Sequence, residues 1–493
     1  MIAAHLPILQ VAVPLLGAPL CTLSRSSRVA WALALALCGW AFLASLSVLL
    51  RVLNEGPFSY ALGSWAAPWG IEYRVDVLSS SVALLVSALA AVVTLYARDS
   101  VEQELDGDRI PLFYTAYLLC LAGLLGITLT GDVFNLFVFL EISSLSTYTL
   151  IALGRDRRAL TAAYQYLIMG TVGATFVLIG VGLMYLTTGT LNMADLAARL
   201  PLAEPNRTVR VAFAFLTVGI CLKLALFPLH LWLPDAYTFA PSAVTALLAS
   251  TATKVAVYML LRFFYTVFGP SFSFHEMALG WVLLPFALVA IFSMSLVAIF
   301  QGQVKRMLAY SSVAQIGYII LGVAMGTATG LTASLLHLFN HALMKGTLFL
   351  ALGCVAYRVG STRLEAMAGL ARQMPWTMAA FVVGGLSLIG VPLTAGFVSK
   401  WYLLLAAIER GWWPVAVLVI AASLMALVYI WRVVEAAYLQ SPSAATARVV
   451  EAPATLLIPT WLLATANLYF GIDGTRTAAI AGEAAASLLG VVP

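Results

Sequence analysis

Charged residues are scarce in this sequence of 493 residues. They make up 10% of the chain, whereas hydrophobic residues make up 62%. A soluble domain has about 25% charged and about 45–50% apolar residues, so the composition leaves no room for a separate soluble domain. The small net charge of +5 is spread over short loops, and no basic block suited to nucleic acid appears. The chain is expected to be a polytopic membrane protein.

Other signals are also missing. The five cysteines lie far apart without a C-x-x-C motif, which gives an iron–sulfur or thiol-redox role little support. The N-terminus lacks the basic region of a signal peptide and is interpreted as a first span. No phosphate loop, nucleophile triad or cofactor motif appears. We therefore expect no enzyme active site of its own, no cofactor and no metal.

Apolar runs long enough to cross a membrane fill the chain, since a span needs about 20 residues. They predict about fourteen spans, at 2–22, 28–53, 76–96, 111–129, 133–153, 160–187, 208–229, 241–263, 279–300, 307–326, 331–357, 375–409, 412–439 and 453–471. The segment 375–409 is too long for one helix and is expected to break into two. Segment 54–75, rich in glycine, proline and tryptophan, is expected to form an ordered external loop.

Basic residues set the orientation. Lysine and arginine gather in the loops that follow odd-numbered spans, for example at Arg155, Arg157 and Arg158. Such loops face the cytoplasm by the positive-inside rule. Both termini are therefore expected on the outer face of a bacterial plasma (inner) membrane.

Five ionisable residues lie inside the apolar runs. They are Glu141, Lys223, Lys254, Lys345 and Lys400. Each costs about 2.5–3.5 kcal/mol at the bilayer centre on the insertion scale. Structure alone rarely needs such a set, so the default interpretation is a path for protons or ions.

Glu141 and Lys223 are expected to act as a pair. Burial favours the neutral form of each group, and an opposite charge nearby restores the charged form. A glutamate–lysine pair that can separate is therefore a protonation switch. The alternative for Glu141 is a carboxyl group satisfied by the backbone and by Ser143, Ser144 and Ser146.

A second group extends this path. Small residues around Lys254 leave room for water, and His337, His341 and Lys345 follow at i, i+4 and i+8, on one helix face. Histidine suits proton relays because it titrates near neutral pH. The alternatives for the two histidines are haem or metal ligation and purely structural hydrogen bonding.

Two proline-interrupted segments carry a lysine near the interruption. In CLKLALFPLHLWLP, Lys223 precedes Pro228 and Pro234, and in GGLSLIGVPLTAGFVSKW, Pro392 precedes Lys400. Broken helices at corresponding positions indicate inverted repeats around an ion site. Their spacing fits two five-helix repeats, and two unrelated kinks are the alternative. Lys400 is a candidate exit group, or else a side chain that snorkels to the interface.

The motifs around these residues resemble a known family. GDVFNLFVFLEISSLSTYTLIALG, LFPLHLWLPDAY, TATKVAVYMLLR, VKRMLAYSSVAQIGYIILG, HLFNHALMKGTLFL and GVPLTAGFVSK are similar to the antiporter-like subunits of respiratory complex I. They are more similar to the D-type subunit of Mrp multisubunit Na⁺/H⁺ antiporters. Lysine at position 400 disfavours the M-type subunit of complex I, which has glutamate there.

The resemblance implies an all-α fold of about fourteen transmembrane helices, with two inverted five-helix repeats and discontinuous helices 7 and 12. The units would be residues 1–110 (helices 1–3 and the external loop), 111–263 (helices 4–8), 264–439 (helices 9–13) and 440–493 (helix 14). It also implies a Glu141–Lys223 pair, a central Lys254, a connection through His337, His341 and Lys345, and a terminal Lys400.

Two functions follow as expectations. The first is a proton-translocating subunit of a multisubunit antiporter that exchanges protons for Na⁺ or another monovalent cation, working with other membrane subunits in the lipid bilayer. The second is a proton-pumping subunit of a complex I-type NADH-quinone oxidoreductase or a membrane-bound hydrogenase. Both would use the same path.

Overall fold

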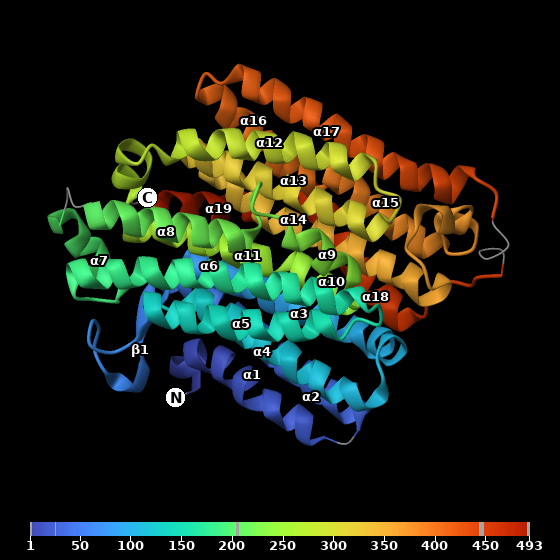
Figure 1. The fold of residues 1–493 in the computed structure, drawn as a ribbon, viewed down its shortest axis with the longest axis horizontal. Coiled ribbons are helices and arrows are strands. Elements are labelled where there is room, and N and C mark those ends of the chain that lie inside the picture. The colour runs from blue at the N-terminus through green and yellow to red at the C-terminus, as the bar shows by residue number, and fades with distance from the viewer. Residues whose placement is uncertain (1, 25, 204–206, 443–447, 491–493) are drawn as a thin grey trace.

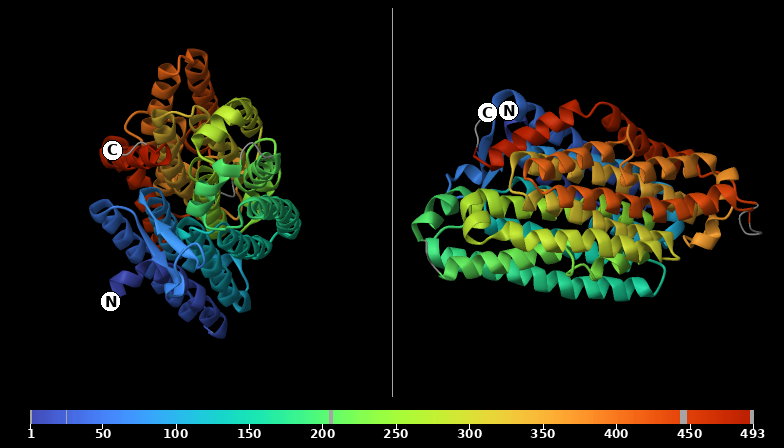
Figure 2. Two further views of the ribbon diagram at one scale, coloured as in Figure 1. Left: turned by 90° about the vertical axis from the view of Figure 1, so that its left-hand side faces the viewer. Right: turned by 90° about the horizontal axis from the view of Figure 1, so that it is seen from above.

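The protein is a bundle of helices that run nearly side by side (Figure 1). The computed structural model describes residues 2–24, 26–203, 207–442 and 448–490. Figure 2 shows the bundle end-on and from above, with both chain ends marked at one end of the bundle. Apolar segments form helices because a helix satisfies its backbone hydrogen bonds without water, as a membrane interior requires.

The α-helices in chain order are α1 (Leu6–Leu23), α2 (Ser27–Glu55), α3 (Val77–Glu104), α4 (Ile110–Leu129), α5 (Val133–Ala152), α6 (Arg158–Thr188), α7 (Met193–Arg199), α8 (Arg207–Leu224), α9 (Trp232–Phe239), α10 (Ser242–Ser250), α11 (Ala252–Leu261), α12 (Leu279–Ile299), α13 (Val304–Ala324), α14 (Ala328–Val359), α15 (Pro375–Ile389), α16 (Ala395–Glu409), α17 (Trp413–Val434), α18 (Ala454–Ile472) and α19 (Thr475–Leu488). Short 3₁₀ or π-helical segments are η1 (Ile2–His5), η2 (Leu62–Ser64), η3 (Gly107–Arg109), η4 (Leu200–Ala203), η5 (Arg262–Val267), η6 (Ser271–Glu276), η7 (Leu364–Met367), η8 (Leu370–Arg372) and η9 (Glu435–Leu439).

The chain is a mostly helical, multi-pass integral membrane protein. Among the described residues, twelve helices are long and apolar enough to cross a membrane. The helices α15 and α16 have 15 residues each, which is short for a complete span. The sequence-based count of about fourteen spans, and the two five-helix repeats, therefore stay predictions.

Helices at the centre of the bundle differ from those at its edge. The segments Ser242–Val267 and Val304–Ala324 are each 94% buried over their most apolar window, with mean hydropathy 1.6. The outer helices α12 and α17 are only 39% buried, with mean hydropathies of 2.6 and 2.3. Lipid is as apolar as leucine and does not repel apolar side chains. Polar residues consequently collect inside the protein, where other helices supply their partners.

The chain is non-helical at both segments where proline was expected to interrupt a helix. Residues 225–231, which contain Pro228, separate α8 from α9, and residues 390–394, which contain Pro392, separate α15 from α16. Pro234 instead lies in the first turn of α9, where a missing amide hydrogen leaves no helical bond unmade. Gly390 ends α15 with φ +89°, a left-handed conformation that suits glycine.

A third interruption carries no proline. The central segment from Ser242 is divided at Thr251, which has φ −125° and ψ −57°. The Lys254 amide then donates to the Thr251 carbonyl at 3.0 Å as α11 begins. The last carbonyls of α10 are thereby left without their usual amide partners.

A two-stranded hairpin covers one end of the bundle. The strands β1 (Phe58–Ala61) and β2 (Glu72–Val75) pair antiparallel, with Phe58 opposite Val75. The Glu72 carboxylate accepts a hydrogen bond of 2.7 Å from the Asn192 side chain. The external loop expected between residues 54 and 75 is thus ordered, and we name its side of the bundle the hairpin end.

Two of the three unit boundaries expected from the sequence coincide with the ends of helices. A boundary after 110 coincides with the start of α4, and one after 439 with the end of η9, whereas one after 263 lies inside η5. Residues 440–493 were expected to hold one transmembrane helix, whereas the described residues of this range form two helices, α18 and α19. The sequence did not indicate α19 because it has only 14 residues and includes Arg476 and Glu483.

Candidate functional site

The charged residues expected in the spans come from five helices and lie at the centre of the bundle. Lys223, Lys254, Lys345 and Lys400 are at most 5% exposed, and His337 and His341 are buried as well. Glu141 on α5 is the exception, with 26% of its side chain exposed. The helix α14, which carries both histidines and Lys345, packs against α3, α10, α13, α15, α16, α18 and α19.

Glu141 and Lys223 lie together. The Lys223 Nζ is 3.7 Å from Glu141 Oε1 and donates a hydrogen bond of 2.8 Å to Ser144 Oγ. Within the part of the chain that the structure describes, Glu141 Oε1 accepts no hydrogen bond. The ion pair is therefore loose on the glutamate side, while the serine anchors the ammonium.

A small cavity adjoins Lys223. Its volume is about 30 Å³, and its walls include Lys223, Ser144, Tyr166 and Ala252. This is enough room for about one water molecule. Because Ala252 opens α11, the cavity lies between Lys223 and the helix that carries Lys254.

Lys254 binds the interruption between α10 and α11. Its Nζ donates a short hydrogen bond to the Ala249 carbonyl and a longer one, 3.3 Å, to Thr253 Oγ1. Ala249 belongs to the last turn of α10, so its carbonyl has lost the amide that a continuous helix would offer. A cation at the C-terminal end of a helix also meets the negative end of the helix dipole.

The face of α14 meets polar residues that the sequence reasoning did not single out. His337 Nδ1 lies 2.9 Å from Ser399 Oγ, and its Nε2 lies 2.9 Å from Gln315 Oε1. Lys345 Nζ donates to the Leu308 carbonyl at 2.9 Å and to Ser311 Oγ. Ser311 and Gln315 stand at i and i+4 of α13, which was a readable signal, since two polar residues on one face of an apolar span need a partner.

His341 is the freest group of the set. Neither ring nitrogen has a hydrogen-bond partner among the described residues. Its ring is parallel to that of His337, with centroids 6.1 Å apart and an interplanar angle of 8°. Lys345 follows His341 by four residues on α14, so the two side chains lie on one helix face. The imidazole therefore adjoins an ammonium group and has no competing partner among the described residues.

Lys400 repeats the arrangement of Lys254 at the other broken helix. Its Nζ donates to the carbonyls of Leu388 and Ile389, at 3.0 and 2.9 Å, and to Ser423 Oγ at 3.0 Å. These carbonyls end α15 at the interruption. The ammonium also lies 4.8 Å from the ring centroid of Tyr318. The side chain is buried, so it does not snorkel to the interface.

Within the described part of the chain, the two histidines have no third side chain beside them that could complete a metal site. Among the described residues, no group of three or more histidine, cysteine, aspartate or glutamate side chains is placed to hold a metal ion. His337 uses both ring nitrogens for side-chain contacts.

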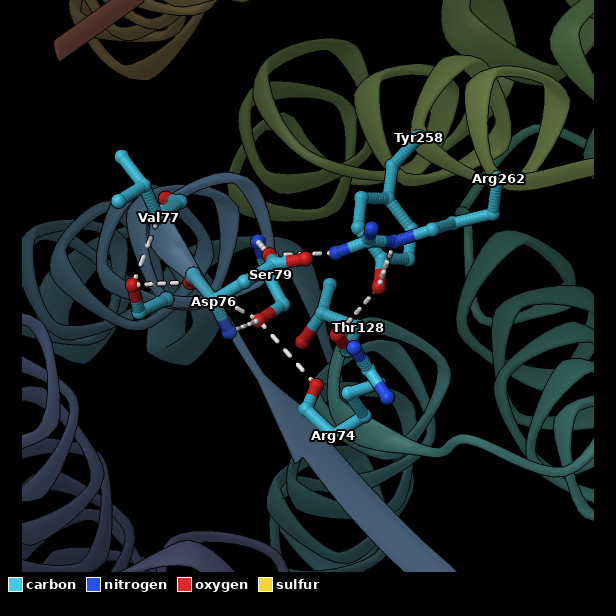
Figure 3. Close-up of polar contacts among 8 residues, drawn as sticks. Arg74, Asp76, Val77, Ser79, Thr128, Tyr258 and Arg262 are labelled. Carbon is cyan, nitrogen blue, oxygen red and sulfur yellow. Dashed lines mark hydrogen bonds and ion pairs between the residues drawn. The ribbon is translucent and has the colours of Figure 1, made fainter. Parts of the chain in front are cut away.

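A buried ion pair at the hairpin end was not foreseen (Figure 3). Arg262 donates from Nη2 to Asp76 Oδ1 at 2.5 Å and from Nε to the Tyr258 hydroxyl at 2.9 Å. The Tyr258 hydroxyl in turn donates to the Thr128 carbonyl at 2.6 Å. Asp76 caps α3 together with Ser79. The pair therefore ties α3 and α4 to the helix of Lys254.

The charge of Asp76 depends on this pair. Burial raises the pKa of Asp76, but the Arg262 guanidinium and the hydrogen bonds from Ser79 outweigh burial and hold that pKa below its usual value. A carboxylate with a lowered pKa stabilises the fold at neutral pH and loses that contribution as acid protonates it.

Comparisons with known proteins identify relatives in one family of membrane proteins. A family model described as NADH:quinone oxidoreductase/Mrp antiporter, TM, matches residues 130–426. The chain is 43% identical to the NADH-quinone oxidoreductase subunit N of Desulforudis audaxviator (strain MP104C), over 95% of this chain and 96% of that protein. It is 33% identical to the D-type Na(+)/H(+) antiporter subunit of Alkalihalophilus pseudofirmus (strain ATCC BAA-2126 / JCM 17055 / OF4), over 78% and 77%.

A solved structure has the same fold. A chain in the Mrp complex from Dietzia sp. DQ12-45-1b superposes with a TM-score of 0.91 at 28% sequence identity, covering 99% of this chain and 98% of that one. The comparisons do not single out the D-type assignment that the sequence motifs favoured, because the oxidoreductase relative has the higher identity of the two.

We predict that Asp76→Asn lowers stability by about 3 kcal/mol, because removing one partner of a buried ion pair leaves the other charge uncompensated. The thermal unfolding midpoint of the purified protein in detergent measures this. Asp108→Asn, at an exposed position, is the matched control. An Asp76→Asn variant as stable as the control would contradict the structural role of the pair.

Proposed function

The chain belongs to the NADH:quinone oxidoreductase/Mrp antiporter family of membrane proteins, and we propose that it moves protons across a bacterial plasma membrane within a complex of several membrane subunits. The observation that carries this proposal is the buried series of titratable groups from Glu141 and Lys223 to Lys400. Lys254, Lys345, Lys400 and His337 each contact polar partners that carry no opposite charge. His341 has no such partner among the described residues, and Lys223 is paired with Glu141. Protons are the one cargo that such a series suits.

The Glu141–Lys223 pair acts as the switch. Two unit charges 4 Å apart attract each other by about 4 kcal/mol at an effective dielectric constant of 20. At 3.7 Å the glutamate stabilises the ammonium, yet no hydrogen bond locks the two together. When Glu141 is protonated or moves away, this attraction is lost and Lys223 releases its proton more readily. The adjoining cavity offers that proton a water-sized step toward α11.

The middle of the series, from Lys254 to His337, transfers the proton toward Lys400. Lys254 and Lys345 donate hydrogen bonds to backbone carbonyls and hydroxyls, and His341, one turn before Lys345 on α14, has both ring nitrogens unengaged among the described residues. A neutral imidazole accepts a proton on one nitrogen and gives one up from the other. His337 contacts Ser399 on α16, the helix that carries Lys400, which makes it the candidate connection to the last lysine.

The first candidate assembly is a multisubunit antiporter that exchanges protons for Na⁺ or another monovalent cation. The motif set, the D-type relative and the fold of the Mrp complex chain support it. In this assembly the chain is a secondary transporter subunit with no catalytic residue of its own. Its termini would face the outer side of the membrane, as the distribution of basic residues favours.

The second candidate is a proton-pumping subunit of a redox complex. Its support is the 43% identity, over nearly the whole chain, to a protein named as an NADH-quinone oxidoreductase subunit. Purifying the native complex separates the two. Membrane subunits without flavin or iron–sulfur absorption would support the antiporter. Co-purified flavin and iron–sulfur subunits would overturn it in favour of the redox complex.

We predict that Glu141→Gln and Lys223→Ala each lower proton flux at least about tenfold, the factor that 1.4 kcal/mol represents. Lys223→Arg also fails largely, because a guanidinium does not give up its proton. Flux is measured in vesicles that contain the assembled complex, with the amount of inserted protein checked in parallel. Glu435→Gln, at an exposed site, is the control. Normal proton flux in the Glu141→Gln complex would contradict the role of the Glu141–Lys223 pair as a switch.

Replacing Lys254 should lower proton flux more than replacing either histidine. Lys254→Ala is expected to stop turnover, because Lys254 is the one lysine, histidine or carboxylate side chain in α11 (Ala252–Leu261). His337→Ala and His341→Ala are each expected only to slow it, since water or the remaining histidine fills the gap. Proton flux in the same vesicles decides the order. A dead His337→Ala complex beside an active Lys254→Ala complex would reverse these roles.

We further predict that this chain alone does not exchange sodium. Sodium is a hard cation and prefers several oxygen ligands, whereas the deep groups here are ammonium and imidazole, and Glu141 is the one carboxylate among them. The measurement is sodium-22 uptake by proteoliposomes under an imposed proton gradient, with the intact complex in parallel. Saturable, proton-driven uptake by the isolated chain that is lost in Glu141→Gln would place a sodium site here.

A further inference from the structure

An apolar cavity of about 390 Å³ lies apart from the titratable groups. It is bounded by α2, α3, α14, α18 and α19, and its walls include Leu78, Ser81, Val92, Phe339 and Arg476. Ligand pockets in proteins typically measure about 300–1,000 Å³. Protein interiors are otherwise close-packed, so an unfilled space of this size calls for an occupant.

The cavity runs along the membrane normal. Its wall on α3 extends from Leu78, in the first turn at the hairpin end, to Val92. At a rise of about 1.5 Å per residue, this stretch is about 21 Å long. One leaflet of the hydrocarbon core is about 15 Å thick, half of roughly 30 Å. The cavity is therefore long enough to hold one lipid acyl chain.

Its polar groups gather toward the hairpin end. The helices α18 and α19 run antiparallel to α14, because Phe470 packs on Phe339 while Leu463 meets Gly346. Beyond Phe470, Arg476 thus lies nearer the end of the bundle where α14 begins. The arginine is exposed, and the adjacent acidic side chain is the exposed Asp473, which interacts with it electrostatically. Ser81 is in the second turn of α3, and its Oγ has no hydrogen-bond partner among the described residues.

We propose that this cavity binds a glycerophospholipid of the leaflet at the hairpin end. One acyl chain fills the apolar cavity, the phosphate binds the Arg476 guanidinium, and an ester carbonyl of the glycerol backbone accepts a hydrogen bond from Ser81 Oγ. Arginine suits phosphate because its planar fork forms two hydrogen bonds to the oxygens. A free phosphate would leave the cavity empty, and a polyprenyl chain would leave Arg476 without an anion.

The bound acyl chain would contact α14 on the side away from the two histidines. Leu335, Leu336 and Phe339 of α14 line the cavity, whereas His337 and His341 face the titratable series. The lipid would thus pack against the helix that carries the histidines without entering the proton path. This inference does not depend on whether the assembly is an antiporter or a redox complex.

The test is photo-crosslinking of the purified native complex in nanodiscs. The probe is a phosphatidylglycerol with a diazirine in one acyl chain, and labelled peptides are mapped by mass spectrometry. Labels are expected on Leu78–Val92 of α3 and on Leu335–Leu343 of α14. A polyprenyl quinone with a diazirine in its tail is run in parallel, and it should label these segments less than the phospholipid does.

Two variants, each with a matched control, locate the bound phospholipid. Arg476→Glu should reduce labelling about fivefold, as expected for losing about 1 kcal/mol of headgroup attraction, while Arg410→Glu, at another exposed arginine of the hairpin end, should not. Ala481→Trp, which fills the cavity, should abolish labelling, and Ala479→Trp, on the exposed side of α19, should leave it intact. Should Ala481→Trp not fold, Ser81→Val gives a smaller test with the same sign.

Each other outcome overturns the proposal. Labelling that survives both Arg476→Glu and Ala481→Trp would mean that the probe reacts only from the surrounding bilayer. Stronger labelling by the quinone would make the cavity a polyprenyl site. Absence of lipid label from both segments in the native complex would mean that the cavity does not hold a phospholipid and is covered by another subunit.

Discussion

The cost of burying an ammonium group away from water is the constraint on which the centre of this bundle depends. The ammonium group of a lysine inside a membrane protein must donate hydrogen bonds to acceptor atoms, and few carboxylates lie at that depth. Interrupted helices supply the acceptors for two of the lysines, whereas Lys345 donates to the Leu308 carbonyl and Ser311 Oγ of the continuous helix α13. Lys254 binds the last turn of α10 and Lys400 binds the last turn of α15, where carbonyls have lost their usual amide partners. The interruptions and the lysines thus satisfy each other's unmet hydrogen bonds.

The Glu141–Lys223 pair departs from this rule. Here an opposite charge and a serine, not backbone carbonyls, hold the ammonium, and the carboxylate is partly exposed. Because the attraction depends on the distance between the two side chains, this is the position at which a movement elsewhere in a complex would change proton affinity most. The Asp76–Arg262 pair plays the opposite part. It fixes the far end of the Lys254 helix with short, directed hydrogen bonds.

Part of this arrangement was readable from the sequence. The apolar runs predicted a helical membrane bundle, and the charged residues within them named the candidate site, since nothing else explains Lys254 or Lys345 in such runs. The i, i+4, i+8 spacing placed His337, His341 and Lys345 on one face. The interruption at Thr251 was not readable, because no proline or glycine marks it. Asp76 and Arg262 are 186 residues apart, and only the packed helices bring them together.

The central claim is that the buried lysines carry protons and do not merely join helices. Proton flux through the assembled complex with Lys400 replaced tests it most directly. Lys400→Met keeps most of the length of the side chain but holds no proton, whereas Lys400→Glu keeps a titratable group whose protonated form can donate one hydrogen bond to the Leu388 or the Ile389 carbonyl. The account predicts no flux with methionine and partial flux with glutamate at equal amounts of folded protein. Wild-type flux in the Lys400→Met complex would contradict it.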